Sequence, residues 1–150
     1  MKRRHFLVSA AAAVAAGQAF AAGTLPAVEV YKNPDCGCCS GWVDHLKSAG
    51  FAVNVHDTPD TSAVRKRYGI PEQLGSCHTG VVAGYALEGH VPADDIKRLL
   101  AQRPVAAGLS VPGMPAGSPG MEVGFRKDAY QVLLIDKAGR PSVFAAYPKS

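Results

Sequence analysis

The chain has 150 residues and a formal net charge of +4 at pH 7. Residues 1–21 contain Lys2, Arg3 and Arg4 and no acidic residue, so the rest of the chain carries a net charge of only +1. Beyond the short run Arg65-Lys66-Arg67, which we expect to form a solvated helix face, no stripe of lysine or arginine remains. The composition therefore argues against a nucleic-acid partner.

The N-terminal residues have the parts of an export signal. The basic start Met1-Lys2-Arg3-Arg4 precedes an uncharged, alanine-rich run over residues 6–20, and Ala19-Phe20-Ala21 fits a small-x-small cleavage site. The apolar run is too short for a membrane span. We therefore divide the chain into a cleaved signal peptide, residues 1–21, and a single periplasmic domain, residues 22–150. Arg3-Arg4-His5-Phe6-Leu7 also resembles the twin-arginine signal, which exports folded proteins.

Hydrophobic periodicity predicts alternating strands and helices up to residue 102. Apolar residues recur at helical spacing from Trp42 to Ala49, whereas Phe51, Val53 and Val55 alternate as in a strand. The predicted elements, in chain order, are a strand over Val28–Tyr31, a helix over Cys39–Ala49, a strand over Phe51–His56, a helix over Thr61–Tyr68, strands over Gly80–Gly84 and Tyr85–Val91, and a helix over Ala93–Gln102. This βαβαββα order belongs to the α/β class.

The composition changes after Arg103-Pro104. The segment Ala107–Gly124 is rich in proline and glycine, so we predict a loop there. A C-terminal β-hairpin follows, with strands over Tyr130–Ile135 and Ser142–Tyr147 separated by a glycine-containing turn. The hairpin is expected to extend the sheet at an edge, and the sequence does not identify which edge.

The cysteine spacing is the most specific feature of the sequence. Cys36, Cys38 and Cys39 lie within four residues after the first predicted strand, and Cys77 is the last of the four cysteines. Adjacent Cys38 and Cys39 bridge each other only with strain, and Cys77 can pair with only one of them, so a disulfide framework is the weaker interpretation. A helix N-terminus lowers the pKa of a thiol, so we expect Cys38 and Cys39 to be partly thiolate at neutral pH.

Thiolates bind soft ions, which makes copper and zinc the candidate metals. Structural zinc sites usually take cysteines in pairs from separate knuckles, whereas three of these sulfurs come from one tight loop. We therefore predict that the cysteines bind more than one Cu(I) ion, with sulfur atoms bridging the ions. Zinc is the less favoured metal.

Further candidate ligands lie near the cysteines or in the proline-rich loop. His78 follows Cys77, and the thioethers of Met114 and Met121 are of a type that binds Cu(I), although a strand-end histidine and gap-filling methionines are the ordinary alternatives. Trp42 is expected to pack the first helix onto the sheet or to shield the cluster from water. His45, His56 and His90 are assigned no role.

The predicted order of elements, with Cys-x-x-Cys at the start of the first helix, resembles the thioredoxin fold. Longer motifs resemble the CopG-type periplasmic family of bacterial copper-resistance loci, long catalogued as a domain of unknown function. These motifs are Tyr31-Lys32-Asn33-Pro34-Asp35-Cys36-Gly37-Cys38-Cys39, Ser76-Cys77-His78-Thr79, Gly84-Tyr85, Glu88-Gly89-His90-Val91-Pro92-Ala93 and Pro112-Gly113-Met114-Pro115. The resemblance implies copper binding with the matching cysteines as ligands. It also implies that Cys77 takes the place of the cis-proline of thioredoxin-like oxidoreductases, which weakens that enzymatic interpretation.

The sequence therefore predicts a periplasmic copper-binding protein that holds Cu(I) through its cysteine cluster and contributes to copper resistance or homeostasis. The alternative is a thiol or copper oxidoreductase in which Cys36 and Cys39 exchange electrons with another protein's thiols or with bound copper. Copper ions and other periplasmic copper-handling proteins are the expected partners. We expect no association with a membrane after signal cleavage. No hydrolytic motif is present, and no catalytic residue is assigned.

Overall fold

The computed structural model describes residues 23–149, so the predicted signal peptide of residues 1–21 lies outside the described residues. The elements are β1 (Val28–Lys32), α1 (Gly37–Ser48), β2 (Val53–Asp57), α2 (Thr61–Arg67), the short 3₁₀ helix η1 (Glu72–Leu74), β3 (His78–Val82), β4 (Tyr85–Glu88), α3 (Ala93–Gln102), β5 (Gly108–Ser110), β6 (Tyr130–Ile135) and β7 (Pro141–Tyr147). None of the helices described is long and apolar enough to cross a membrane.

The strands form one seven-stranded sheet in the order β2-β1-β3-β4-β5-β6-β7. β1 pairs in parallel with β2, as β4 does with β5, and the other neighbouring strands are antiparallel. In the middle of β1, Val30 lies opposite Val55 of β2 on one side and Gly80 of β3 on the other. β2 and β7 are therefore the two edges of the sheet.

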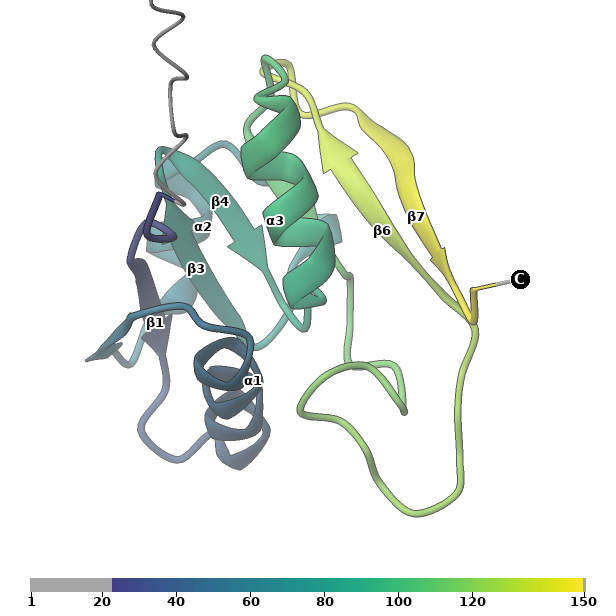
Figure 1. The fold of residues 1–150 in the computed structure, drawn as a ribbon. Helices are drawn as coiled ribbons and strands as arrows, with labels where there is room; N and C mark the ends of the chain where they lie inside the picture. The colour runs from purple at the N-terminus through teal and green to yellow at the C-terminus, as the bar shows by residue number, and fades with distance from the viewer. Residues whose placement is uncertain (1–22, 150) are drawn as a thin grey trace, which may run out of the picture.

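Helices cover both faces of the sheet, with α1 and α3 in front of it and α2 behind it (Figure 1). Trp42 of α1, Ile96 of α3 and Leu87 of β4 belong to one buried cluster. The neighbouring residue of β4, Ala86, packs in a second cluster with Ile70, which follows α2. Successive residues of one strand thus pack into two separate cores, as expected when both faces of a sheet are covered.

The predicted α/β class is confirmed. The bounds of α3 and β6 are those predicted, and the ends of the other predicted elements shift by three residues or fewer. The final hairpin joins the sheet beside β5, which settles the edge that the sequence leaves open.

The predicted loop over Ala107–Gly124 is wrong at its start, where Gly108–Ser110 form β5. This strand is only three residues long and buried throughout, so it shows neither the alternation nor the length by which a strand is predicted. A Cβ at Gly108 would lie 1.9 Å from the carbonyl oxygen of Ala86, so glycine permits the close pairing with β4.

The expectation of a solvated face over Arg65-Lys66-Arg67 is wrong at its first residue. Lys66 and Arg67 are exposed, but Arg65 is buried against the sheet, where its guanidinium pairs with Glu88 and Glu72. The charged run conceals this difference, because successive helical residues point in different directions.

We predict that Trp42→Ala lowers the free energy of unfolding by about 3–5 kcal/mol, because it leaves a cavity in the core. Trp42 is fully buried, and its indole N–H donates to the carbonyl oxygen of Val91 at 2.8 Å. Denaturant unfolding of the metal-free protein in one redox state measures the change. Val105→Ala, at an exposed position, is the control and should change the value by less than about 0.5 kcal/mol. An equally small loss for Trp42→Ala would contradict the packing role.

Candidate metal centre

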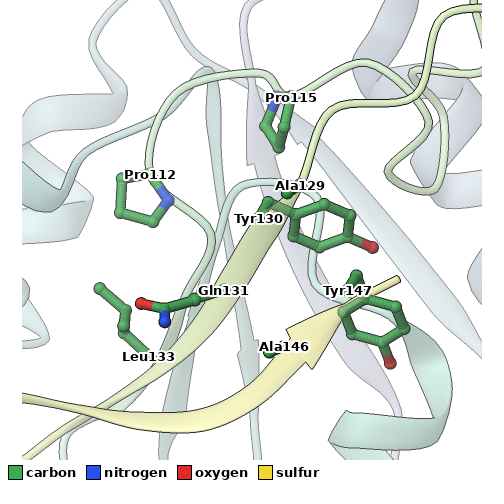
Figure 2. Close-up of a pocket in the computed structure, with 8 residues that line it drawn as sticks. All are labelled: Pro112, Pro115, Ala129, Tyr130, Gln131, Leu133, Ala146 and Tyr147. Atoms are coloured by element: carbon green, nitrogen blue, oxygen red, sulfur yellow. The ribbon is translucent and has the colours of Figure 1, made fainter. Parts of the chain in front are cut away.

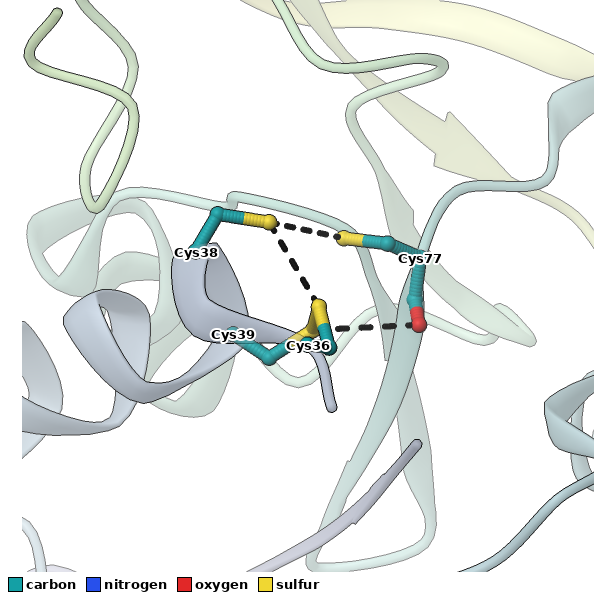
Figure 3. A group of neighbouring side chains, drawn as sticks. All are labelled: Cys36, Cys38, Cys39 and Cys77. Atoms are coloured by element: carbon teal, nitrogen blue, oxygen red, sulfur yellow. Dashed lines mark hydrogen bonds between the residues drawn. A yellow bond between two sulfur atoms is a disulfide. The ribbon is translucent and has the colours of Figure 1, made fainter. Parts of the chain in front are cut away.

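The four cysteine sulfurs meet at the N-terminal end of α1 (Figure 3). The Sγ atom of Cys38 lies 3.5 Å from that of Cys36 and 3.9 Å from that of Cys77. The Sγ atom of Cys39 lies 3.8 Å from the carbonyl oxygen of Cys77, and all four sulfurs lie within 4.8 Å of one another. The structure therefore brings the four predicted cysteines together.

A tight turn after β1 carries the first three cysteines into the helix. The side-chain oxygen of Asn33 accepts from the N–H of Asp35 at 2.9 Å, and its carbonyl oxygen accepts from the N–H of Cys36 at 3.1 Å. Cys36 is the N-cap of α1, so Cys38 and Cys39 lie in the first helical turn. Helix α1 thus begins two residues earlier than predicted.

The fourth cysteine reaches this turn because β1 and β3 are antiparallel neighbours. Lys32, the last residue of β1, lies opposite His78, the first residue of β3. Cys77 immediately precedes His78, so it lies at the same end of the sheet as the turn that begins α1. Strand pairing, rather than proximity in sequence, completes the cluster.

Cys36 and Cys39 form a disulfide, whereas Cys38 and Cys77 are free thiols. The expectations that a disulfide is the weaker interpretation and that Cys39 is partly thiolate are therefore wrong for this state. Adjacent Cys38 and Cys39 are poor partners, but one helical turn brings the Cα atoms of Cys36 and Cys39 to 5.4 Å, within the range of disulfides. A two-electron reduction is needed to release all four thiols.

Burial raises the pKa of the Cys77 thiol to about 11, and the neighbouring Cys38 sulfur acts in the same direction. Cys77 is therefore a neutral thiol at neutral pH in the metal-free protein. A metal ion that binds its sulfur must displace this proton, so binding there is coupled to proton release.

Two buried histidines form a second group of donors with Cys77. The Cys77 sulfur lies 3.2 Å from Nδ1 of His78 and 3.3 Å from Nε2 of His90, and both histidines are fully buried. Nδ1 of His90 donates to the carbonyl oxygen of Pro119 at 2.7 Å. In the neutral imidazole this bond leaves a lone pair on Nε2, which faces the sulfur. Cys77 thus belongs to two groups of donors. We call Cys36, Cys38, Cys39 and Cys77 the sulfur group, and Cys77, His78 and His90 the imidazole group.

The sequence assigns no role to His90, which lies 13 residues after Cys77. The hairpin formed by β3 and β4 returns the chain to the level of Cys77, and the N–H of Gly89 donates to the carbonyl oxygen of His78 at 3.0 Å. Gly89 has a φ of +72° and lies so close to Val111 that a Cβ would be 2.5 Å from its carbonyl oxygen. A sequence analysis that pairs these two strands would place His90 next to Cys77 and so identify it as a candidate ligand.

Met114, the first of the two candidate methionines, contacts the cysteine cluster. Its sulfur is 4.0 Å from Sγ of Cys38, and about half of its side chain is exposed. The neighbouring Gly113 holds the loop in place, because its N–H donates to Gly75 and its carbonyl oxygen accepts from the hydroxyl of Ser76. Within residues 23–149, the side chain of Met121 makes no hydrogen bond with a cysteine.

Trp42 lies under the imidazole group and fulfils its predicted packing role. Its ring centroid is 4.4 Å from that of His78. His45 and His56, the other histidines among residues 23–149, lie outside the cluster: His45 accepts from the N–H of Ala93 at 3.0 Å, and His56 pairs with Glu29.

A pocket of about 610 Å³ lies between the proline-rich loop and the final hairpin (Figure 2). Pro112 and Pro115 line one side, and Tyr130 and Tyr147 line the other. Because no cysteine, histidine or methionine lines it, this pocket is separate from the donor cluster.

Comparisons with known proteins point to copper. The family described as "Protein of unknown function, DUF411" matches residues 74–121. A solved structure titled "Copper resistance protein copG- Form 2" is 51% identical, with a TM-score of 0.79 over 83% of this chain and 99% of that chain. A second, titled "Form 1" of the same protein, is 50% identical, with a TM-score of 0.78 and the same coverage. No curated protein matches the chain.

We predict that the metal-free protein loses stability on acidification and that His78→Phe reduces this loss. Burial lowers the pKa of His78 to about 3, with His90 acting in the same direction, from the ordinary value of 6.5. Between these values the unfolded chain binds a proton that the folded chain does not, so stability falls as the pH falls. The contribution of one such group is about 1.4 kcal/mol per pH unit.

Urea unfolding at several pH values between about 4.5 and 6.5 measures this slope. Burial raises the pKa of Glu88, which changes stability with the opposite sign, so the comparison is between the wild type and the variant rather than with a calculated curve. An equal slope in both proteins would contradict a neutral, buried His78.

Proposed function

The chain belongs to the CopG family of copper-resistance proteins, and on this premise we propose that it binds Cu(I) in the periplasm through Cys36, Cys38, Cys39 and Cys77. In this role it holds copper in a form that protects other periplasmic components and thereby contributes to copper resistance. Copper ions are its cargo, and other periplasmic copper-handling proteins are its expected partners.

The convergence of four sulfurs is the observation that carries this proposal. Two sulfur ligands at about 2.3 Å from one ion lie about 3.8–4.0 Å apart in tetrahedral or trigonal geometry. The Sγ atom of Cys38 already lies 3.5 Å from that of Cys36 and 3.9 Å from that of Cys77. Once reduced, these sulfurs therefore need to move little to share an ion.

The neighbouring donors favour copper over zinc. Cys38 lies between two other sulfurs and next to the thioether of Met114, a soft ligand suited to Cu(I). A sulfur in that position can bridge two ions, so we expect more than one Cu(I) per chain. His78, His90 and Met114 are the additional ligands that the geometry supports, whereas Met121 has no comparable contact in the described residues.

The redox state controls the capacity of the site. Two of the four sulfurs are joined in the Cys36–Cys39 disulfide, and an oxidising compartment favours that bond. Copper that binds the reduced cysteines occupies the thiolates from which a disulfide would otherwise form. Metal loading and disulfide formation therefore compete for the same sulfurs.

The Cys36–Cys39 disulfide also supports a second candidate function, a thiol or copper oxidoreductase. In that function the pair accepts two electrons, either from a dithiol that becomes a disulfide or from two Cu(I) ions that become Cu(II), and the uptake of two protons converts it to two thiols. The two proposals differ in whether reduced protein retains copper or only exchanges electrons with it.

We predict that the reduced protein binds more than one equivalent of Cu(I), because its four thiolates can bridge ions. Titration of residues 22–150 with Cu(I) in the presence of a competing chelator measures the stoichiometry. Cys77→Ser should lower both the stoichiometry and the affinity, since Cys77 belongs to the sulfur and imidazole groups alike.

The protein with its disulfide intact is the matched control, because only Cys38 and Cys77 are then free. It should bind less Cu(I) than the reduced protein. Saturation at one equivalent, or unaltered binding by Cys77→Ser, would refute the four-cysteine site.

We also predict that replacing Cys38 and Cys39 by serine on the chromosome raises copper sensitivity to the level of a gene deletion. The formation of disulfides in other periplasmic proteins should stay normal. Growth over a copper series, together with the redox state of those proteins, measures both effects. Normal copper tolerance combined with misoxidised periplasmic proteins would instead support the oxidoreductase.

A further inference from the structure

A buried ion pair lies behind the cysteine cluster. Arg65 of α2 donates from Nε to Oε1 of Glu88 at 2.8 Å, and the two side chains are 6% and 0% exposed. The second carboxylate oxygen of Glu88 accepts from the hydroxyl of Thr79 at 2.6 Å. Arg65 also donates to Glu72 at 2.6 Å, but that carboxylate is 74% exposed.

The pair binds both backbone groups of Ser76, the residue before Cys77. The Ser76 N–H donates to Oε1 of Glu88 at 2.7 Å, and the Ser76 carbonyl oxygen accepts from Arg65 at 2.9 Å. That carbonyl belongs to the planar peptide bond that joins Ser76 to Cys77. The ion pair thus orients the peptide from which the Cys77 side chain projects.

The same residue connects the pair to the loop that carries Met114. The hydroxyl of Ser76 donates to the carbonyl oxygen of Gly113, the residue before Met114. Gly75 allows Arg65 to reach Ser76, because a Cβ at Gly75 would lie 2.8 Å from Cζ of the guanidinium. The segment of residues 75–77 therefore binds the Arg65–Glu88 ion pair on one side. On the other side it binds the loop that carries Met114.

We infer that Arg65 and Glu88 are positioning residues for copper: they fix Ser76 so that the sulfur of Cys77 faces Cys38, and this inference rests on the proposed function. Stability alone does not require an ion pair here, because a buried pair can often be replaced by apolar side chains without loss of stability. The hydrogen bonds to Ser76, in contrast, cannot be made by apolar side chains. The pair thus supplies directional contacts at the residue beside a predicted ligand.

The test is a Cu(I) competition titration of reduced protein with Glu88→Gln. Glutamine keeps one acceptor oxygen but removes the charge that pairs with Arg65 and strengthens the hydrogen bond from Ser76. Disturbing a contact that orients a metal ligand typically weakens metal affinity about 10- to 100-fold, and we expect a loss of this size. Glu72→Gln is the matched control, because it removes the exposed partner of the same arginine and leaves Ser76 untouched. It should bind Cu(I) as the wild type does.

A double-mutant cycle with Cys77→Ser separates positioning from general stability. If Glu88 acts through Cys77, then Glu88→Gln should cause little further loss of affinity in the Cys77→Ser protein. The same fold-loss in both backgrounds would overturn the inference. The Cu(I)–thiolate absorption should change in Glu88→Gln and match the wild type in Glu72→Gln.

The paired replacement Arg65→Met with Glu88→Leu covers the case in which Glu88→Gln does not fold. It leaves no unpaired buried charge, and it should lose Cu(I) affinity as Glu88→Gln is expected to do. Wild-type affinity in a folded paired variant would overturn the inference while leaving the four-cysteine site standing. Equal Cu(I) binding by the wild type and Cys77→Ser would overturn both.

Discussion

The antiparallel pairing of β1 with β3 is the constraint on which the candidate site depends. It places Lys32 opposite His78, so the turn that leads into α1 and the residue that precedes β3 lie at the same end of the sheet. Three sulfurs are close by sequence, but the fourth and both buried histidines enter through this pairing and the adjoining hairpin. A shift in register would separate Cys77 from Cys38 although each local element remained intact.

The surroundings of Cys77 explain why the site is sheltered in the absence of metal. Partial burial keeps its thiol protonated, and burial keeps the two neighbouring imidazoles uncharged at neutral pH. Neutral imidazoles are the form that binds metal, whereas the thiol first has to give up its proton. Binding therefore exchanges the thiol proton for a cation, which avoids leaving an uncompensated thiolate in a partly buried position.

Features with a strong local signal were predictable from the sequence. Helix α3 follows a proline and has acidic residues in its first turn, β6 is bounded by its glycine-containing turn, and three of the cysteines are near neighbours in the chain. Features created by pairing of distant segments were not predictable. β5 is too short to be periodic, Arg65 is concealed within a charged run, and His90 reaches Cys77 only after β4 folds back on β3. The Cys36–Cys39 disulfide lies between these cases. The spacing of its two cysteines is local, but the redox state decides whether they form a disulfide or remain thiols that can bind metal.

The donors come from parts of the chain that are far apart. Cys38 lies 39 residues from Cys77 and 76 residues from Met114, and His90 is oriented by the carbonyl group of Pro119. Bringing such segments together costs loop-closure entropy, which an ion that contacts several of them helps to offset. Bound copper would therefore act as a cross-link between the two halves of the domain. Through mass action, the concentration of available copper would then help to determine how long the folded chain survives in the cell.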